Sequence, residues 1–454
     1  MGSIEVPANV LYGAETARAA AWSFTTHRLP LTVVRALGEL KAAAARVNTT
    51  AGRLPPDLGN AIERAATEVA QGVHDAEFVV DLFQTGSGTS SHMNANEVIA
   101  ARANQLLGGG TRVHAHDHVN IGQSSNDVMP SAVLLAVLRA GEQRLVPALD
   151  RLVATLHDLA DRHWGDVRNG RTHLMTAMPI RFGQQFRGQA QQVAACRERL
   201  AASLDACRAL PLGGTAIGTG VNCPPGFAAA VCRACDELFG LRVRETSTHL
   251  VAQASLGPLP WFSGDLRTTA GSLYKLVNDL RWQAADGLRE VQLPALQPGS
   301  SIMVGKVNPV VCEAVLMVCA QVAGNDGVVA FAASQGQFEL NTMVPVVARN
   351  VLESIELLAG ASEALREHAL LGLRLRDEAA REVDKNPILA TALVADLGHD
   401  RAAELARAAT AADLSVLALA LQQHLLPEAR LRELLDVTRL CGDVGHQRGS
   451  ERDA

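Results

Sequence analysis

The chain has 454 residues, of which 48% are hydrophobic and 19% are charged. This composition excludes a disordered or collagen-like chain, because such chains lack the apolar residues that a large core needs. The formal net charge of −6 does not favour nucleic acid or an anionic membrane as a partner. The first residues carry no basic segment before an apolar run, so we expect no secretory leader. We also expect no stretch of about 20 residues to be apolar enough to span a bilayer.

The eight cysteines are scattered through the chain, which is typical of a reduced, cytoplasmic protein. Cys232 and Cys235 form one CxxC pair. A zinc site would need a second ligand pair at suitable spacing, and the sequence offers none. We therefore expect structural thiols on one helix face, with a metal or redox role as the alternative.

Apolar residues recur at helical spacing along most of the chain, and strand signals are few. Two amphipathic helices are expected over residues 34–50 and 60–73. A longer apolar stripe covers residues 131–162, with Pro147 as the expected place of a kink. Further long helices are expected over 181–209, 258–285, 307–331 and 344–372, and short ones over 401–410, 413–422 and 427–435.

The helix expected over 307–331 is apolar almost all round. Glu313 is the only charged residue between Lys306 and Asp326, so we expect this helix to lie inside a bundle. The helix lengths predict a fold dominated by α-helices, with a bundle longer than a compact domain needs. We expect a mixed, mostly helical N-terminal domain, a central long-helix bundle and a small helical C-terminal domain, over residues 1–127, 128–377 and 378–454.

Four polar, glycine-rich loops between these helices carry more hydrogen-bond donors than simple connectors need. In the first, residues 84–96, two glycines would let the backbone approach a ligand, and Ser87 and Thr89 add hydroxyl groups. The second loop, residues 114–127, presents hydroxyl groups and an amide just before a long helix, where free N–H groups favour a carboxylate. These side chains are Ser124, Ser125 and Asn126.

The third and fourth loops add ionisable groups. The third, residues 170–173, ends at His173 on entry to another helix, and the fourth, residues 299–309, carries two serines, a lysine and an asparagine. One such loop alone is usually a cap or a turn, and a lone histidine is usually structural. Together the loops supply neutral donors and one lysine with few acids, which fits a small dicarboxylate better than a phosphate or a cation. A metal site is the alternative for His114, His116 and His118.

At these loops the sequence resembles the fumarase/aspartase superfamily, and most closely the class II fumarate hydratases. The matching stretches are TGSGT, DHVN with QSSND, GRTHL, LGGTAIGTG, NDLRW, GSSIM with GKVNP, and FELN. The resemblance covers nearly the whole chain and implies an all-α-dominated, three-domain fold. It also implies a homotetramer in which five-helix bundles form a twenty-helix core and three subunits share each active site. We expect no cofactor and no metal.

The resemblance implies the reversible anti addition of water to fumarate, which gives L-malate in the tricarboxylic acid cycle. Ser300 matches the general base that takes the C3 proton, and it would need Lys306 and backbone N–H groups to stabilise its alkoxide. Proton abstraction leaves an aci-carboxylate with doubled charge, and Lys306 and Asn308 match its donors. His173 and Glu313 match a dyad in which the imidazole exchanges a proton with the water. A buried Glu313 carboxylate would need a partner such as His173.

The resemblance assigns further positions. The loop that carries Ser300 is expected to be mobile and to close over the substrate. His114 and Asp117 match a peripheral anion site. The remaining substrate-binding positions are Ser87, Thr89, Ser124, Ser125, Asn126 and Thr172.

The sequence departs from the family pattern around these residues. Val304 stands where proline is usual, so the Ser300 loop loses a restriction on φ. The stretch 282–289 is shorter than its usual counterpart. The other departures are histidines for asparagines at 92 and 116, Thr176 for aspartate, Gln185 for glutamate and Gln337 for asparagine.

These departures leave two alternatives to hydration. One is a fumarate-forming C–N lyase that acts on aspartate or an N-substituted aspartate, since one polar contact can change preference strongly. His173 argues against this alternative, because aspartases carry glutamine there. The other is a non-catalytic protein of the same fold, against which the complete set of Ser300, Lys306, Asn308 and Glu313 argues.

Overall fold

A computed structural model describes residues 2–110 and 112–444 and is dominated by helices. The chain forms two compact units. The first comprises Met1–Pro147, Glu198–Ala270 and Ala320–Ala359, and the second comprises Ala148–Arg197, Gly271–Cys319 and Gly360–Ala454. Four long helices contribute residues to both units: α7 (Phe182–Ala206), α10 (Leu259–Ala284), α11 (Val310–Ala333) and α12 (Val344–Leu365).

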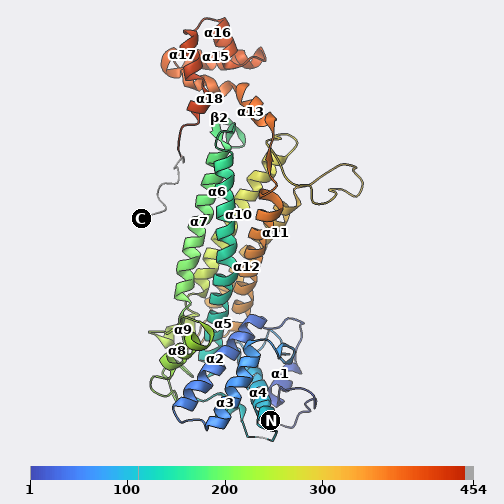
Figure 1. Cartoon of the computed structure of the whole chain (residues 1–454), viewed down its shortest axis with the longest axis vertical. Coiled ribbons are helices and arrows are strands. Elements are labelled where there is room, and N and C mark those ends of the chain that lie inside the picture. Colours follow the sequence, from blue (N-terminus) through green and yellow to red (C-terminus); the bar gives the residue numbers. More distant parts are fainter. Residues whose placement is uncertain (1, 111, 445–454) are drawn as a thin grey trace. The chain divides into compact units, whose positions relative to one another are not determined.

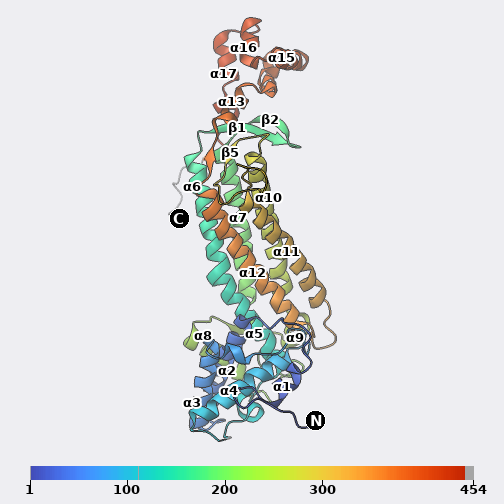
Figure 2. The same ribbon diagram turned by 90° about the vertical axis from the view of Figure 1, so that its right-hand side faces the viewer.

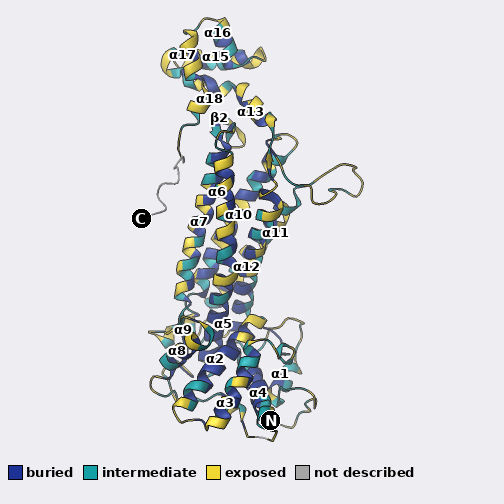
Figure 3. Ribbon diagram, viewed as in Figure 1, coloured by how far each residue is buried: buried dark blue, intermediate teal, exposed yellow. Residues whose placement is uncertain are grey.

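In the first unit, α2 and α3 pack side by side, and α2 also contacts α5 and α8 (Figure 1). Most of α2 is buried (Figure 3), and its small side chains allow close packing. At Gly38 a Cβ atom would lie 2.5 Å from the Ala70 nitrogen, so only glycine fits there. The α-helices that lie wholly in this unit are α1 (Ala14–Ala20), α2 (Leu31–Thr50), α3 (Pro56–Ala70), α4 (Thr89–Leu106), α5 (Ser125–Ala140), α8 (Phe227–Phe239) and α9 (His249–Ser255).

The expected long helices are confirmed, and two of them contain a π-helical turn among the described residues; one of these turns, Arg366–Leu370, follows α12 within the helix expected over 344–372. The stretch 131–162 is divided into α5, a π-helical turn over Gly141–Leu145, and α6 (Val146–Arg162). The turn ends two residues before Pro147, which has no N–H to donate to the preceding turn. A short two-stranded parallel sheet joins β3 (Ala209–Leu210) to β4 (Arg244–Glu245).

In the second unit, an antiparallel hairpin of β1 (Val167–Thr172) and β2 (Met175–Arg181) precedes α7 (Figure 2). The strands β5 (Val291–Gln292) and β6 (Arg374–Leu375) also pair antiparallel. The expected short C-terminal helices are confirmed and enclose their own core around Leu393, Ala420 and Leu431. These helices are α13 (Asp377–Asp384), α14 (Val394–Leu397), α15 (His399–Ala411), α16 (Val416–Gln422), α17 (Glu428–Leu434) and α18 (Val437–Leu440).

The helix α11 is less buried than its composition predicts. One stripe of side chains, including Cys312, Val322 and Val329, is buried, while Met317 and Phe331 are 69% and 63% exposed. The expectation that α11 is enclosed in a bundle is therefore wrong for the single chain. In the single chain only one stripe of this helix is fully covered, and apolar side chains on the opposite face are largely exposed.

The expectation that no segment is apolar enough to span a bilayer is also corrected at α11. By length and composition alone this helix meets that condition. Its polar groups, however, bind neighbouring helices. The Asn325 amide donates to Ser354 Oγ at 3.1 Å, and Arg267 and Ser263 bind Asp326 at 2.8 and 2.7 Å. These contacts are typical of a helix packed in a protein bundle.

Candidate functional site

The first expected loop, residues 84–96, is shorter in the structure, because α4 begins at Thr89 and includes residues 89–96. Ser87 is buried, and its Oγ lies 3.0 Å from Thr89 Oγ1, so the two hydroxyl groups form one pair. Two positions of this loop require glycine. A Cβ at Gly86 would lie 1.8 Å from the Thr342 carbonyl oxygen, and Gly88 has a positive φ of 81°.

The second loop places its donors at the start of α5. Ser124 is the N-cap of this helix: its side chain accepts from the Asn126 N–H, and Asp127 accepts from the Ser124 N–H at 2.9 Å. The Asn126 amide donates to the Ala216 carbonyl at 2.7 Å, and Ser125 Oγ lies 2.8 Å from His92 Nδ1. The structure thus brings Ser124, Ser125 and Asn126 to one helix N-terminus, with two of them held by other segments.

Two buried ionisable side chains, Asp127 and Lys41, hold this loop in place. Asp127 accepts hydrogen bonds from the N–H groups of Gly213 and Thr215, both at 2.9 Å, and so ties the segment after β3 to α5. Lys41 donates to Asn120 Oδ1 at 3.0 Å. Burial raises the pKa of Asp127 and lowers the pKa of Lys41 to about 7. The charges of Asp127 and Lys41 attract each other, and this attraction opposes both pKa shifts.

Within the same loop, Asp117 lies on a π-helical segment (Ala115–Val119), and His114 is the N-cap of that segment. Both side chains are exposed, and His114 Nδ1 is 3.2 Å from Asp117 Oδ2. The neighbouring His116 binds Glu15 at 2.7 Å. Among the described residues, no group of three or more His, Cys, Asp or Glu side chains has an arrangement that could hold a metal ion.

Thr172 is the last residue of β1, and His173 is the first turn residue of the β1–β2 hairpin, so neither lies at a helix entry. His173 and Leu174 have φ values of 55° and 62°, which places both turn residues in the left-handed region. Both Thr172 and His173 are exposed. A bulge at Gly170 lets the strands approach, because a Cβ there would lie 2.5 Å from the Met178 carbonyl oxygen.

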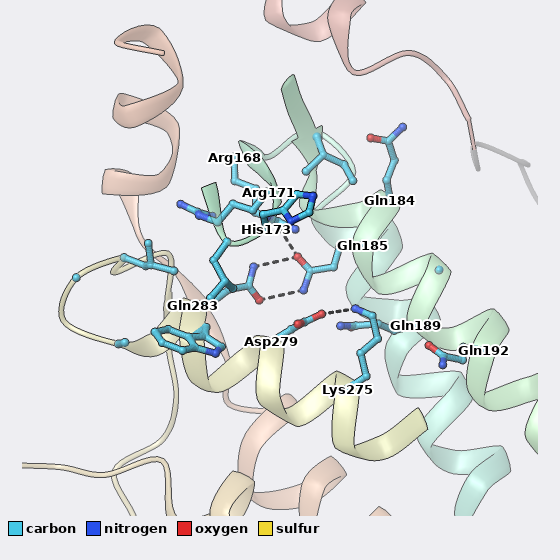
Figure 4. A pocket seen from close by; sticks show the side chains of 17 residues that line it. Arg168, Arg171, His173, Gln184, Gln185, Gln189, Gln192, Lys275, Asp279 and Gln283 are labelled. Atoms are coloured by element: carbon cyan, nitrogen blue, oxygen red, sulfur yellow. Dashed lines mark hydrogen bonds and ion pairs between the residues drawn. The ribbon is translucent and has the colours of Figure 1, made fainter. Parts of the chain in front are cut away.

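A polar network holds this hairpin in place beside a cavity of about 930 Å³ (Figure 4). Arg171 binds the buried carboxylate of Glu290, and Arg168 Nε donates to Gln185 Oε1 at 2.8 Å. Gln185 and Gln283 exchange two hydrogen bonds of 2.9 Å, and Figure 4 shows this pair between α7 and α10. Burial lowers the pKa of Arg168 in spite of Glu290. The network thus includes Gln185, one of the departures noted in the sequence.

The fourth loop closes on itself through its backbone. The Gly299 N–H donates to the Lys306 carbonyl at 2.7 Å, and the Asn308 amide donates to the Gly299 carbonyl at 2.8 Å. Within this closed loop, Ser300 Oγ accepts hydrogen bonds from the N–H groups of Ile302 at 3.2 Å and Met303 at 2.9 Å. Ser300 therefore lies in the positive field of two backbone N–H groups, and it lines a shallow cavity together with Lys306.

The exposure of Glu313 differs from the prediction. It lies in the first turn of α11 and is exposed, so it is not the buried carboxylate that the apolar helix predicts. No hydrogen bond joins it to His173 within residues 2–110 and 112–444. His173 and Ser300 also line different cavities. The structure therefore gathers the predicted residues into groups, but it does not complete the dyad within one chain.

Sequence reasoning missed the residues that hold these groups in position. Arg171, Glu290 and Gln283 fix the hairpin, and Lys41 and His92 support the start of α5. The sequence shows His92 as a departure from the family pattern but does not indicate its hydrogen-bond partner. A charged residue such as Lys41 inside an alanine-rich helix face is the one signal in the sequence that could have revealed a buried polar contact.

The sequence is similar to those of known proteins over nearly its whole length. The profile of a family described as "Lyase" matches residues 2–324, and one described as "Fumarase C C-terminus" matches residues 389–442. A curated "Fumarate hydratase class II" of Xylella fastidiosa is 43% identical over 445 residues, covering 97% of this chain and 94% of the relative. "Fumarate hydratase class II 2" of Pseudomonas aeruginosa is 44% identical and covers 97% of both chains.

The fold is also similar to that of solved structures. The crystal structure of a recombinant class II fumarase from Schistosoma mansoni has a TM-score of 0.94 and 34% sequence identity, covering 97% of this chain and 98% of that one. A native fumarate lyase:delta crystallin from Brucella melitensis has a TM-score of 0.88 and 37% identity. The similarity spans both compact units.

Proposed function

The chain belongs to the family of class II fumarate hydratases, and we propose that it catalyses the reversible anti addition of water to fumarate, which gives L-malate. The substrate is a small dicarboxylate. The observation that carries the mechanism is the position of Ser300 Oγ, which accepts two backbone hydrogen bonds on a loop closed by Lys306 and Asn308. A serine hydroxyl is far too weak a base unless its alkoxide is stabilised in this way.

In the dehydration direction, Ser300 takes the proton from C3 of malate. The two N–H groups of Ile302 and Met303 and the ammonium group of Lys306 favour the charged form of its oxygen. The resulting aci-carboxylate carries a second negative charge, which Lys306 and Asn308 stabilise as donors. One N–H of the Asn308 amide holds Gly299, and the other serves the carboxylate. Donors set for this charge lower the barrier more than they bind malate.

His173 then delivers a proton to the departing hydroxyl, which leaves as water. In the hydration direction it takes a proton from the attacking water. Glu313 would orient and polarise the imidazole. Because the two residues form no contact within one chain, we propose that they meet across subunits.

The second carboxylate of the substrate binds the hydroxyl and amide groups at the starts of α4 and α5, with Thr172 from the hairpin. The pairing of Ser87 with Thr89 and the helix N-terminus at Ser124 supply neutral donors and a favourable dipole for an anion. These residues are Ser87, Thr89, Ser124, Ser125, Asn126 and Thr172. His114 and Asp117, which are exposed, would form a peripheral anion site.

We further propose that the protein is a homotetramer with active sites shared by three subunits, and that it is cytoplasmic. The exposed apolar face of α11, with Met317, Val328 and Phe331, supports an oligomer because a helix face of this composition is buried in stable proteins. All eight cysteines are free, as expected in a reducing compartment.

The test is the formation of fumarate from L-malate by the Ser300→Ala variant. We expect kcat to fall by at least about 10³-fold, because the variant retains the binding groups but lacks the base. Ser301→Ala is the matched control, since Ser301 is the next residue of the same exposed loop, and its kcat should stay within about twofold of the unchanged chain. Equal activity of the two variants would contradict the role of Ser300.

A further inference from the structure

The contact between His92 and Ser125 joins the starts of two helices in the first unit. His92 lies on α4 and is fully buried, and its Nδ1 atom is 2.8 Å from Ser125 Oγ at the first position of α5. The other ring nitrogen, Nε2, is buried and has no partner among the described residues. His92 therefore makes one hydrogen bond, and that bond goes to a residue of the proposed substrate site.

We propose that His92 is a positioning residue that donates its Nδ1–H to Ser125 Oγ and so directs the Ser125 hydroxyl proton toward the substrate carboxylate. This inference rests on the proposed function, because it assigns the direction of a hydrogen bond within that site. A hydroxyl that accepts from His92 still has its own proton to donate. If it donated to His92 instead, it could offer the carboxylate only lone pairs, which repel it.

The surroundings of the ring favour this tautomer. With the proton on Nδ1, the buried Nε2 presents only a lone pair. With the proton on Nε2, a buried N–H would have no acceptor among the described residues, and an unpaired buried N–H is costly. Burial and the charge of Lys41 lower the pKa of His92 well below its usual value, so the ring stays neutral and one nitrogen remains unprotonated.

The chain offers a matched set of variants. His92→Phe keeps the ring volume and removes the donor, whereas His92→Asn keeps a donor on a shorter side chain. Asn94→Leu is the control for lost packing and hydrogen bonding on the same helix, because Asn94 is equally buried but donates to the Glu77 carbonyl at 3.0 Å. Each variant is tested with Ser125 intact and with Ser125→Ala.

For His92→Phe we expect KM for fumarate to rise about five- to tenfold, the value of one neutral hydrogen bond, with kcat within about twofold. His92→Asn should restore KM to within about twofold of the unchanged chain. In the Ser125→Ala background, His92→Phe should raise KM by less than about twofold more. Asn94→Leu should lower the melting temperature without changing KM.

Two results would overturn the proposal. One is an equal effect of His92→Phe with and without Ser125, which would indicate a structural role only. The other is a ¹⁵N NMR spectrum of histidine-labelled protein in which the signal lost in His92→Asn shows a proton on Nε2. If the unchanged chain forms no fumarate from L-malate, the proposed function fails instead, and the NMR result still decides the tautomer.

Discussion

Arg171 binds the carboxylate of Glu290, a residue 119 positions further along the chain whose side chain is only 3% exposed. Arg168 lies 4.0 Å from the same carboxylate, so one buried acid serves two arginines of β1. Gln283 also donates to Glu290, at 3.1 Å. This acid therefore fixes the strand that leads to Thr172 and His173.

We expect Glu290→Gln to be strongly destabilising, by about 3–5 kcal/mol, because it leaves two arginines without a buried counter-charge. The melting temperature of the purified variant measures this loss. Glu142→Gln is the control, since Glu142 pairs with Arg208 at the surface, and its loss should cost at most about 1 kcal/mol. Similar melting temperatures for the two variants would show that Glu290 does not hold the hairpin.

Lys306 should act in the transition state more than in binding. We expect Lys306→Met to lower kcat by about 10²- to 10³-fold with a much smaller change in KM, because the lysine faces charge that develops only during proton abstraction. Steady-state kinetics with L-malate measure both constants. Lys385→Met, which removes an exposed lysine near Asp413, should leave kcat unchanged. A large rise in KM at constant kcat would assign Lys306 to ground-state binding instead.

The exposed face of α11 should control assembly. We expect Phe331→Glu to reduce the mass of the protein in solution and to abolish activity, because a charge on a buried apolar interface is not compensated. Val322→Ala on the buried stripe of the same helix is the control, which should lower stability without changing the mass. Analytical ultracentrifugation distinguishes the two. An unchanged mass with Phe331→Glu would exclude this face from the interface.

Lys41 should make stability depend on pH. Burial lowers its pKa to about 7 from 10.5, so between these values the unfolded chain holds a proton that the folded chain does not. The free energy of unfolding should therefore rise with pH, by roughly 1 to 2 kcal/mol between pH 7 and 8.5. Urea unfolding of Lys41→Met at a fixed protein concentration should lack this rise. The same slope in both proteins would contradict the buried lysine.

The parts of the site that rest on local pattern could be predicted from the sequence. Ser124, Ser125 and Asn126 lie at the start of a long helix, as expected, and the long helices follow from apolar periodicity. The hairpin turn could not be predicted, because His173 and Leu174 adopt positive φ without glycine or asparagine. The partners Arg171 and Glu290 lie too far apart in sequence for any local signal. The exposure of Glu313 differs from the prediction, because the apolar composition of α11 predicts burial on all faces, whereas the single chain buries only one stripe of this helix.

The most direct measurement is the absorbance of fumarate after the purified protein is mixed with L-malate and, separately, with L-aspartate and an N-substituted aspartate. The leaving group is the one property that distinguishes hydration from C–N lyase chemistry on the same site. We predict turnover of L-malate alone. Fumarate formed from an amino substrate, with none from L-malate, would contradict the account. It would indicate that the departures from the family pattern, such as Gln185 and His92, have changed the leaving group.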